Sequence, residues 1–381
     1  MQKARLIYIG KPGSAVFESQ VIQILIEIKS KNIFDEVILL AGIESSGDSN
    51  MINDLIKRTG LRVETFKKYP NYHFFREFQK KALSKSLTKL LCENVIIHTR
   101  GETFSQVIKP IVDKTKYKSV KILTDVRGAI YEETLFYKKM KAIPFQLKLY
   151  QHKKNLKVLS KNTDFISCVS EKLKSYVLDR VNIEEEKVGI NPCSASELFF
   201  YSSKSREEFR QKLKIKNTDK VFIFATGGND NWQNTGEIIK SIASKGFRVL
   251  NLSRSKIEVE NVINLFVPYS DVPKYLNSAD VAVVWRKNDI VNNVASPVKF
   301  SEYACCGLPI VSNRGVNLIT DYIENSKNGL LIDSFDELSS SVVDNLISID
   351  RNQISKNAKM KFSSTVIIEN YLKMYSQLLK S

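Results

Sequence analysis

The chain has 381 residues, of which 43% are hydrophobic and 26% charged, and its formal net charge is +17. This length exceeds one ordinary hydrophobic core and predicts two α/β domains. No apolar run is long enough to span a membrane, so the sequence predicts a protein without a membrane-spanning helix.

The positive charge indicates which classes of partner are possible, and the cysteines indicate whether a metal site is present. An excess of lysine and arginine fits a nucleic acid, an anionic membrane or a phosphorylated substrate, and it fits equally a lysine-rich composition without functional meaning. The five cysteines are irregularly spaced, and Cys305 and Cys306 are adjacent. No CxxC pair or Cys/His cluster indicates a zinc site. We therefore expect a reduced, cytoplasmic protein that binds no metal and no cofactor.

The first half alternates short apolar runs with segments of helical periodicity. The first run, residues 6–9, is ended by a Gly-Lys-Pro-Gly turn, too early for the apolar region of a signal peptide. A helical pattern follows over 16–28. Further strands are expected at 37–41, 95–98, 120–124 and 165–169. Strands that alternate with helices predict βαβ units and a parallel sheet.

The second half repeats this organisation after a boundary at Asn191-Pro192. Its expected strands are 221–225, 248–252, 262–266, 281–285 and 309–311, with helices over 202–216 and 235–244. We expect a first domain over 1–192, a second over 193–362, and a final helix within 363–381 that packs back on the first domain. Two doubly wound domains that face each other leave a cleft, and ligands bind at the carboxyl ends of such strands.

The segment 296–311 carries the most chemical information. Ser296 is expected to cap a helix that begins at Pro297 and ends at Gly307. The free N–H groups of its first turn suit a diphosphate. Lys299 and Glu302 are three residues apart and share one helix face, so Lys299 could hold a phosphate and Glu302 two ribose hydroxyls. The alternative is an ordinary ion pair on an exposed helix.

This segment resembles the donor-site signature of the family 4 glycosyltransferases, roughly Pro-x-Lys-x-x-Glu-Tyr-x-Ala-x-Gly-Leu-Pro-Val. Weaker resemblances cover most of the chain: Val-Ser at 169–170, Asn-Pro at 191–192, the loop at 268–273 with Tyr269 near the nucleotide base, and Asn-Gly-Leu-Leu at 328–331. The resemblance implies a GT-B fold, two Rossmann-like domains facing across a cleft. It also implies a retaining, metal-independent sugar transfer from a nucleotide-diphosphate sugar.

The sequence departs from the family pattern at two places. The second glutamate of the family, eight positions before Glu302, is Val294 here, so sugar contacts are expected from Asn293 or its neighbours. The usual Arg and Lys after the first strand of the second domain are also missing, since the loop reads Gly-Gly-Asn-Asp-Asn-Trp-Gln-Asn from 227 to 234. Gly228 is expected to approach the donor there. Arg254 could supply the missing charge, or it could be a solvated loop arginine.

Acceptor residues are expected in the first half. His98-Thr99-Arg100-Gly101 and Asp125-Val126-Arg127-Gly128 each follow an apolar run and therefore lie at the carboxyl end of a strand. Arg127 could bind a phosphate bidentately, and Asp125 could orient or deprotonate an acceptor hydroxyl. The alternative is that these side chains cap helices and neutralise each other, which we favour for His98. Gly13 is expected to let the backbone approach the donor phosphates.

The segment 131–161 mixes basic and aromatic residues. This composition suits an anionic membrane or a lipid diphosphate, and it suits equally a solvated helix face. Its lysines are Lys138, Lys139, Lys141, Lys148, Lys153, Lys154, Lys157 and Lys161.

Together the residues and the resemblance predict a hexosyltransferase of cell-surface polysaccharide synthesis (capsule or O-antigen). Its acceptor is expected to be a lipid-linked glycan, and its place the cytoplasm or the inner face of the plasma membrane. A sugar-nucleotide epimerase or hydrolase of the same fold is the alternative. A nucleic-acid-binding protein is permitted by the charge, but no binding motif is present, so no nucleic-acid partner is expected.

Overall fold

The computed structural model describes residues 4–45, 48–137, 143–226 and 235–380. The chain forms two compact units. The first comprises Met1–Pro192 together with Ile368–Ser381, and the second comprises Cys193–Ile367. The second unit thus continues past residue 362, where the sequence placed its end.

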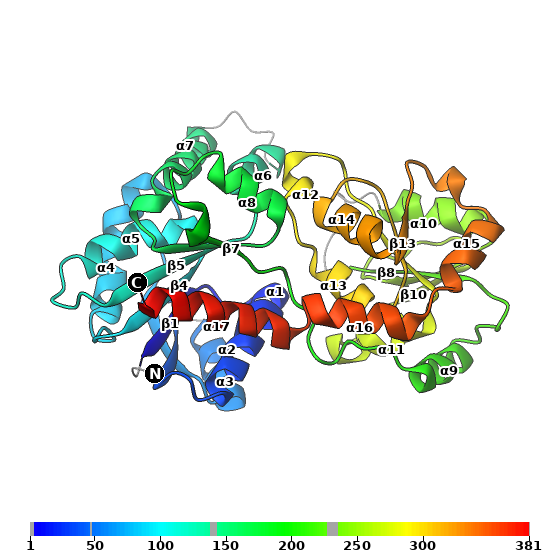
Figure 1. Ribbon diagram of the computed structural model, residues 1–381, viewed down its shortest axis with the longest axis horizontal. Coiled ribbons are helices and arrows are strands. Elements are labelled where there is room, and N and C mark those ends of the chain that lie inside the picture. Colours follow the sequence, from blue (N-terminus) through cyan, green and yellow to red (C-terminus); the bar gives the residue numbers. More distant parts are fainter. Residues whose placement is uncertain (1–3, 46–47, 138–142, 227–234, 381) are drawn as a thin grey trace. The chain divides into compact units, whose positions relative to one another are not determined.

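The first unit contains a seven-stranded parallel sheet with the strand order β3-β2-β1-β4-β5-β6-β7 (Figure 1). The order reverses between β1 and β4, which is the point where doubly wound sheets bind ligands. The strands are β1 (Arg5–Gly10), β2 (Glu36–Ile43), β3 (Arg62–Lys67), β4 (Val95–Arg100), β5 (Val120–Val126), β6 (Phe165–Cys168) and β7 (Val188–Ile190).

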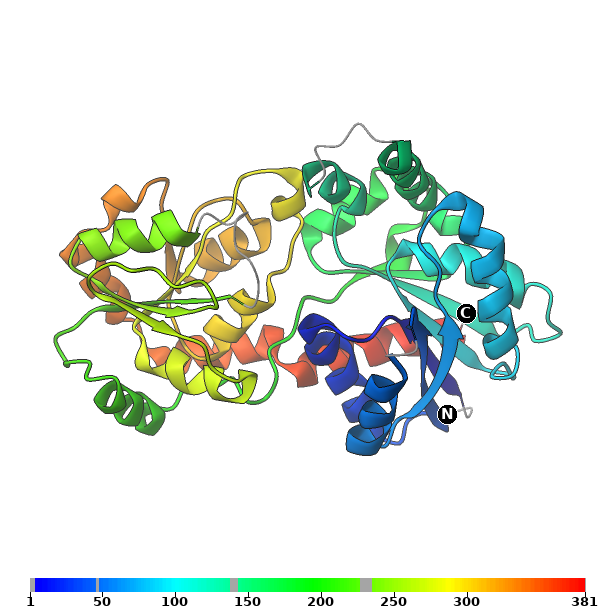
Figure 2. The same cartoon turned by 180° about the vertical axis from the view of Figure 1, so that it is seen from behind.

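Helices cover both faces of this sheet (Figures 1 and 2). Side chains of α4 and α5 pack on one face, where Leu83 and Ile108 join Ile7 and Ile97 in one core. The helical segments are α1 (Ala15–Phe17), the π-helical turn η1 (Glu18–Ile22), α2 (Gln23–Ser30), α3 (Asp48–Thr59), η2 (His73–Phe75), α4 (Arg76–Leu87), α5 (Glu102–Val112), α6 (Ile130–Tyr137), α7 (Ile143–Lys157), η3 (Leu159–Lys161), α8 (Glu171–Leu178), η4 (Glu185–Lys187) and α17 (Ser364–Lys380).

The C-terminal helix α17 belongs mostly to the first unit. The hydroxyl group of Tyr375 lies 2.7 Å from Nδ1 of His98, and the Tyr371 ring meets the His98 ring edge-on. Tyr8 on β1 lies against the same imidazole, with ring centroids 4.5 Å apart. His98 is therefore a buried core residue, and this burial lowers its pKa to about 4.

The second unit contains a six-stranded parallel sheet of order β10-β9-β8-β11-β12-β13, which reverses between β8 and β11. Helices α10 and α15 pack on one face, and α11, α13 and α16 pack on the other. The strands are β8 (Val221–Ala225), β9 (Arg248–Leu252), β10 (Val262–Leu265), β11 (Val281–Val284), β12 (Ile310–Ser312) and β13 (Gly329–Leu331). The helices are α9 (Ser203–Lys212), α10 (Thr235–Ser244), η5 (Tyr269–Asp271), α11 (Val272–Ser278), α12 (Ile290–Asn293), α13 (Val298–Cys305), α14 (Asn317–Ser326), η6 (Phe335–Glu337), α15 (Ser340–Ile347) and α16 (Arg351–Phe362).

These two sheets confirm the predicted α/β class with two Rossmann-like, doubly wound domains. The strand order 3-2-1-4-5-6 is that of the Rossmann fold, and every strand pair is parallel. Among the helices that the structure describes, none combines the length and hydropathy needed to cross a membrane.

Candidate functional site

The helix α13 begins one residue later than the sequence predicts. Pro297 is its N-cap, with an extended backbone (φ −68°, ψ 123°) and no side-chain cap, and the first helical residue is Val298. The predicted cap, Ser296, is wrong. The Ser296 hydroxyl oxygen instead accepts a hydrogen bond of 3.0 Å from the Cys193 N–H, and Ser301 of α13 donates to the Cys193 carbonyl oxygen. The start of the second unit is thus tied to the start of α13.

The end of α13 follows the prediction. Gly307 has φ +72° and lies just past the helix, as in a Schellman motif. Its N–H donates to the Ala304 carbonyl oxygen (2.9 Å), and the Leu308 N–H donates to the Tyr303 carbonyl oxygen (3.1 Å). This turn leads the chain directly into strand β12.

The carboxylate of Glu302 is buried and has a partner on each oxygen. Its side chain is 1% exposed. Oε2 lies 2.7 Å from the Lys299 ammonium group, and Oε1 accepts a hydrogen bond of 3.0 Å from the Tyr269 hydroxyl group. The Lys299 ammonium group also lies 5.8 Å from the centre of the Tyr269 ring. The pair is therefore not the exposed surface ion pair that the sequence left open as the alternative.

The Glu302 carboxylate affects the protonation of the Tyr269 hydroxyl group. Burial raises its pKa well above the usual value, and the charge of Glu302 and the hydrogen bond to it act in the same direction. Tyr269 therefore stays protonated and donates to Glu302. Tyr269, Lys299 and Glu302 come from η5 and α13, so two segments 30 residues apart meet at one carboxylate.

Of the other predicted donor residues, Arg254 lies in a loop and Asn293 is the last residue of the short helix α12. Arg254 follows β9, is exposed, and places its guanidinium group 5.0 Å from the centre of the Phe266 ring. The Asn293 side-chain amide donates to the Asn288 side-chain oxygen and the Gly315 carbonyl oxygen, so it braces the loop before α13. Gly228 lies outside the described residues.

In the first unit, Asp125 and Arg127 lie together at the end of β5. The Asp125 carboxylate is 1% exposed, and its Oδ2 lies 3.4 Å from Arg127 Nη1. Its other oxygen, Oδ1, is buried and has no hydrogen-bond partner among the described residues. Leaving a buried carboxylate oxygen without a partner costs roughly 1–3 kcal/mol or more. Such an atom marks a place for a ligand or a water molecule.

The loop after β1 contains Gly13. Its φ of +111° favours glycine, and a Cβ there would lie 3.4 Å from the sulfur of Met51. The next residue, Ser14, caps α1 by accepting from the Phe17 N–H. The expected approach of this backbone to donor phosphates stays a prediction.

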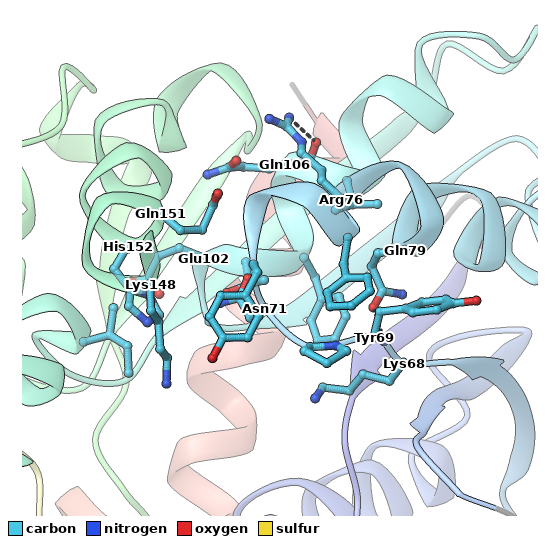
Figure 3. A pocket seen from close by; sticks show the side chains of 18 of the residues that line it. Lys68, Tyr69, Asn71, Arg76, Gln79, Glu102, Gln106, Lys148, Gln151 and His152 are labelled. Atoms are coloured by element: carbon cyan, nitrogen blue, oxygen red, sulfur yellow. Dashed lines mark hydrogen bonds between the residues drawn. The ribbon is translucent and has the colours of Figure 1, made fainter. Parts of the chain in front are cut away.

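The first unit also holds a pocket of about 540 Å³ at the carboxyl ends of β3, β4 and β5 (Figure 3). Lys148, Gln151 and His152 of α7 lie on one side, and Lys68, Tyr69 and Gln79 lie on the other. The end of β4, the start of α5 and the loop after β5 supply further lining residues: Arg100, Gly101, Glu102, Thr103, Phe104, Arg127 and Gly128.

Burial changes the charge of the groups that line this pocket. It raises the pKa of Glu102 to about 7, and the nearby charge of Glu133 adds to the rise. It also raises the pKa of Glu133, although Lys148 opposes the shift. Burial and Lys148 together lower the pKa of His152 to about 4. At neutral pH the imidazole is therefore uncharged, and Glu102 is about half protonated.

Most of this pocket is not predicted by the sequence. Arg100 was noted only within the His98 tetrapeptide, and Glu102, Gln151 and His152 were not noted as site residues. One signal was available: Arg-Gly occurs at the carboxyl end of both β4 and β5, at Arg100-Gly101 and Arg127-Gly128. Because adjacent parallel strands end at the same edge, this repeat places two arginines side by side. Within the described part of the chain, no three His, Cys, Asp or Glu side chains gather as metal ligands.

Comparison with known proteins agrees with this architecture. Residues 248–361, which include Tyr269, Lys299 and Glu302, match the family model described as Glycosyl transferases group 1. No curated protein sequence matches the chain.

Several solved structures share the fold. A glycosyltransferase from Rickettsia africae is 11% identical, with 100% of both chains covered and a TM-score of 0.69. Anabaena HepE, in complex with UDP-glucose, is 12% identical, with 98% of this chain and 99% of that chain covered and a TM-score of 0.66. WaaG, a glycosyltransferase involved in lipopolysaccharide biosynthesis, is 13% identical, with 98% of each chain covered and a TM-score of 0.59.

At these identities the structural likeness establishes the fold alone, and it confirms the GT-B class. The match to the family model adds a glycosyltransferase group 1 domain, and this domain supports the prediction that the protein is a glycosyltransferase.

Proposed function

We propose that the protein transfers a sugar from a nucleotide-diphosphate donor to a hydroxyl group of a glycan acceptor. The observation that carries the proposal is the buried Glu302, whose two oxygens are held by Lys299 and Tyr269 within the segment that matches the glycosyltransferase model. The UDP-glucose bound in the structure of Anabaena HepE supports a donor of this class.

In this proposal the donor binds along α13. Glu302 accepts hydrogen bonds from the ribose hydroxyl groups, and Tyr269 fixes the orientation of its carboxylate. Lys299, Arg254 and the N–H groups at the start of α13 stabilise the negative charge that develops on the leaving diphosphate. The catalysis is electrostatic, so neither a metal ion nor a covalent nucleophile is required. Ser296, Pro297 and Asn293 shape the loop that places these groups.

Asp125 is proposed to orient or deprotonate the acceptor hydroxyl group, and Arg127 to bind a negative charge near it. The unpartnered Oδ1 of Asp125 supports this role, because a general base needs a free lone pair. Retention of the anomeric configuration follows from the resemblance to family 4. The role of WaaG in lipopolysaccharide biosynthesis supports a lipid-linked acceptor in cell-surface polysaccharide synthesis.

The proposal is tested by replacing Glu302 with alanine. Each charge-assisted hydrogen bond contributes roughly 1.5–3 kcal/mol, so losing two ribose contacts should weaken nucleotide-sugar binding at least a hundredfold. A panel of nucleotide sugars is screened by thermal shift on the wild type, and the affinity of the best one is then measured for both proteins.

The matched control is Glu184→Ala, because Glu184 forms an i,i+3 pair with Lys187 at 2.7 Å on the exposed surface. This variant should bind the donor as the wild type does. A Glu302→Ala protein with wild-type affinity would contradict the proposal. Product analysis with the donor alone separates the rival chemistry, because an epimerase or hydrolase converts the nucleotide sugar without an acceptor.

A further inference from the structure

The pocket at the ends of β3, β4 and β5 has an excess of positive charge. Five basic side chains line it: Lys68, Arg76, Arg100, Arg127 and Lys148. Two are neutralised by carboxylates outside the lining, since Lys68 lies 2.5 Å from Glu44 and Arg127 lies 3.4 Å from Asp125. The carboxyl groups of the lining itself are Glu102 and Glu133. Burial raises the pKa values of both, and the five basic side chains outnumber these two carboxyl groups.

The pocket also contains buried polar atoms without partners. Arg100 Nη1, Gln151 Oε1 and His152 Nε2 are each buried and form no hydrogen bond with any residue that the structure describes. Gln151 and His152 are both 4% exposed. Since an unmade hydrogen bond in the interior is costly, three such atoms around one cavity indicate that a polar ligand completes the site.

Hydrogen bonds hold the polar side chains on one side of the pocket in fixed positions. Asn155 Oδ1 accepts hydrogen bonds from the side-chain amides of both Gln106 and Gln151. Because the Gln151 nitrogen is used in this way, its oxygen is left facing other partners as an acceptor. Arg76 is positioned by a hydrogen bond of 3.3 Å to the Gln106 carbonyl oxygen (Figure 3). Donors and acceptors that are fixed before binding lose little entropy when a ligand arrives.

The opposite wall is aromatic. Tyr69, Tyr72 and Phe75 line the pocket, and the rings of Tyr69 and Phe75 are stacked with centroids 6.0 Å apart. An apolar face opposite a few fixed polar groups is the usual composition of a small-molecule site. A sugar ring has the same two characters, with C–H groups on its faces and hydroxyl groups around its edge.

We propose that this pocket binds the acceptor, and that the acceptor is a sugar bearing an anionic group, a phosphate or a carboxylate, held by Arg76, Arg100 and Lys148. Gln151 and His152 bind its hydroxyl groups, and the aromatic wall packs on its ring. The role of this ligand as the acceptor rests on the proposed glycosyltransferase function, whereas its chemical class rests on the pocket alone.

The first test measures binding of three sugars to the full chain by calorimetry. Glucose 6-phosphate and glucuronate are the anionic probes, and glucose is their neutral match. At least one anionic probe should bind tenfold or more tightly than glucose. A polyprenyl phosphate in detergent micelles serves as a fourth probe, and it separates a lipid phosphate from a charge on the sugar. Equal affinity for the charged and neutral probes would overturn the proposal.

The variant Arg76→Gln/Lys148→Gln assigns that binding to the pocket. Both side chains are partly exposed, so the fold should survive, which a melting curve checks. The variant should lose at least tenfold in affinity for the preferred anionic probe. The control is Lys81→Gln/Lys85→Gln, which removes the same charge from the exposed face of α4 and should bind normally. Wild-type binding by the pocket variant would refute the assignment.

The variant Lys299→Gln distinguishes the proposed donor site from the pocket. It should weaken nucleotide-sugar binding and leave binding of the anionic sugar unchanged. The pocket variant should show the reverse pattern. If the wild type binds no nucleotide sugar while binding of the anionic sugar still depends on Arg76 and Lys148, the proposed function fails and the pocket assignment stands.

Discussion

Two buried glutamates show how the surroundings decide what a carboxyl group can do. Glu302 has Lys299 on one oxygen and the Tyr269 hydroxyl group on the other, so its negative charge is compensated. Glu102 is the first residue of α5, where the helix dipole favours a negative charge. Burial and the charge of Glu133 nevertheless raise its pKa to about 7. Desolvation is therefore the stronger effect at Glu102.

The raised pKa of Glu102 makes stability depend on pH. Between about 4.5 and 7 the folded state keeps a proton that the unfolded state releases, so the free energy of unfolding falls as the pH rises through this window. The loss is on the order of 3 kcal/mol across the window. Glu102→Gln is neutral at every pH. Its unfolding free energy relative to the wild type should therefore rise between pH 5 and pH 8, as measured by urea denaturation.

Glu77→Gln provides the control for this measurement, because Glu77 is an exposed carboxylate whose side chain is 79% accessible. Its pH dependence should follow that of the wild type. A constant difference between Glu102→Gln and the wild type from pH 5 to pH 8 would show that the Glu102 pKa is not raised.

Among the elements, those with continuous apolar runs were predicted well. The expected helix over 235–244 and strand over 248–252 coincide with α10 and β9. Helix α10 has buried apolar residues at helical spacing. Strand β9 is a nearly continuous buried run, because a strand inside a parallel sheet is covered on both faces. Strand β3 was missed, since at the edge of its sheet only Phe66 of its six residues is buried. Its sequence, Arg-Val-Glu-Thr-Phe-Lys, has no apolar run to detect.

The candidate site was predicted less completely than the fold, for two reasons. Helix caps depend on which partner a hydroxyl group finds, and Ser296 binds Cys193, 103 residues away in sequence. The pocket depends on side chains from α4, α7 and three strand ends. No local pattern in the sequence connects His152 to Arg100, because only the order of the strands brings their elements together.

The turn after α13 gives a prediction at the level of the element. A Cβ on Gly307 would lie 2.3 Å from the Arg351 carbonyl oxygen, which is backbone and cannot rotate away. Gly307→Ala should therefore destabilise the protein by roughly 3 kcal/mol, in addition to weakening donor binding through α13. The measurement is the midpoint and slope of urea unfolding.

Gly246→Ala separates the two causes of this loss. Gly246 has a similar φ of +84°, but a Cβ there would meet no atom within 4 Å. Only the left-handed backbone penalty of about 1 kcal/mol applies. If both variants lose the same stability, the close approach of Arg351 has no energetic weight.

On the scale of the whole molecule, the distribution of charge decides whether the net charge of +17 has a function. Helix α7 exposes Leu147 and Tyr150 together with Lys153 and Lys157, and α6 exposes Leu135 and Phe136. We propose that this surface docks on an anionic membrane, where each lysine contributes roughly 1 kcal/mol. Lys138, Lys139 and Lys141 lie outside the described residues.

Replacing Lys153, Lys154, Lys157 and Lys161 with glutamate tests this docking. Each change removes two charges, so four changes lower the net charge from +17 to +9. Binding to vesicles that contain phosphatidylserine should be abolished, as measured by co-sedimentation. The control replaces Lys204, Lys212, Lys216 and Lys256 of the second unit and reaches the same net charge. Equal loss in both variants would indicate a non-specific charge effect and contradict the proposed surface.

The path of the chain has a consequence for biosynthesis. The first unit is assembled from two stretches, and the second stretch supplies Tyr371 and Tyr375, which cover His98 and Tyr8. A ribosome releases residues 1–192 long before α17 emerges. Until then Tyr8 and His98 lack the cover that α17 provides, so the first unit exposes part of its core while 175 residues of the second unit are made. The unit that begins to fold first is therefore the last to be completed.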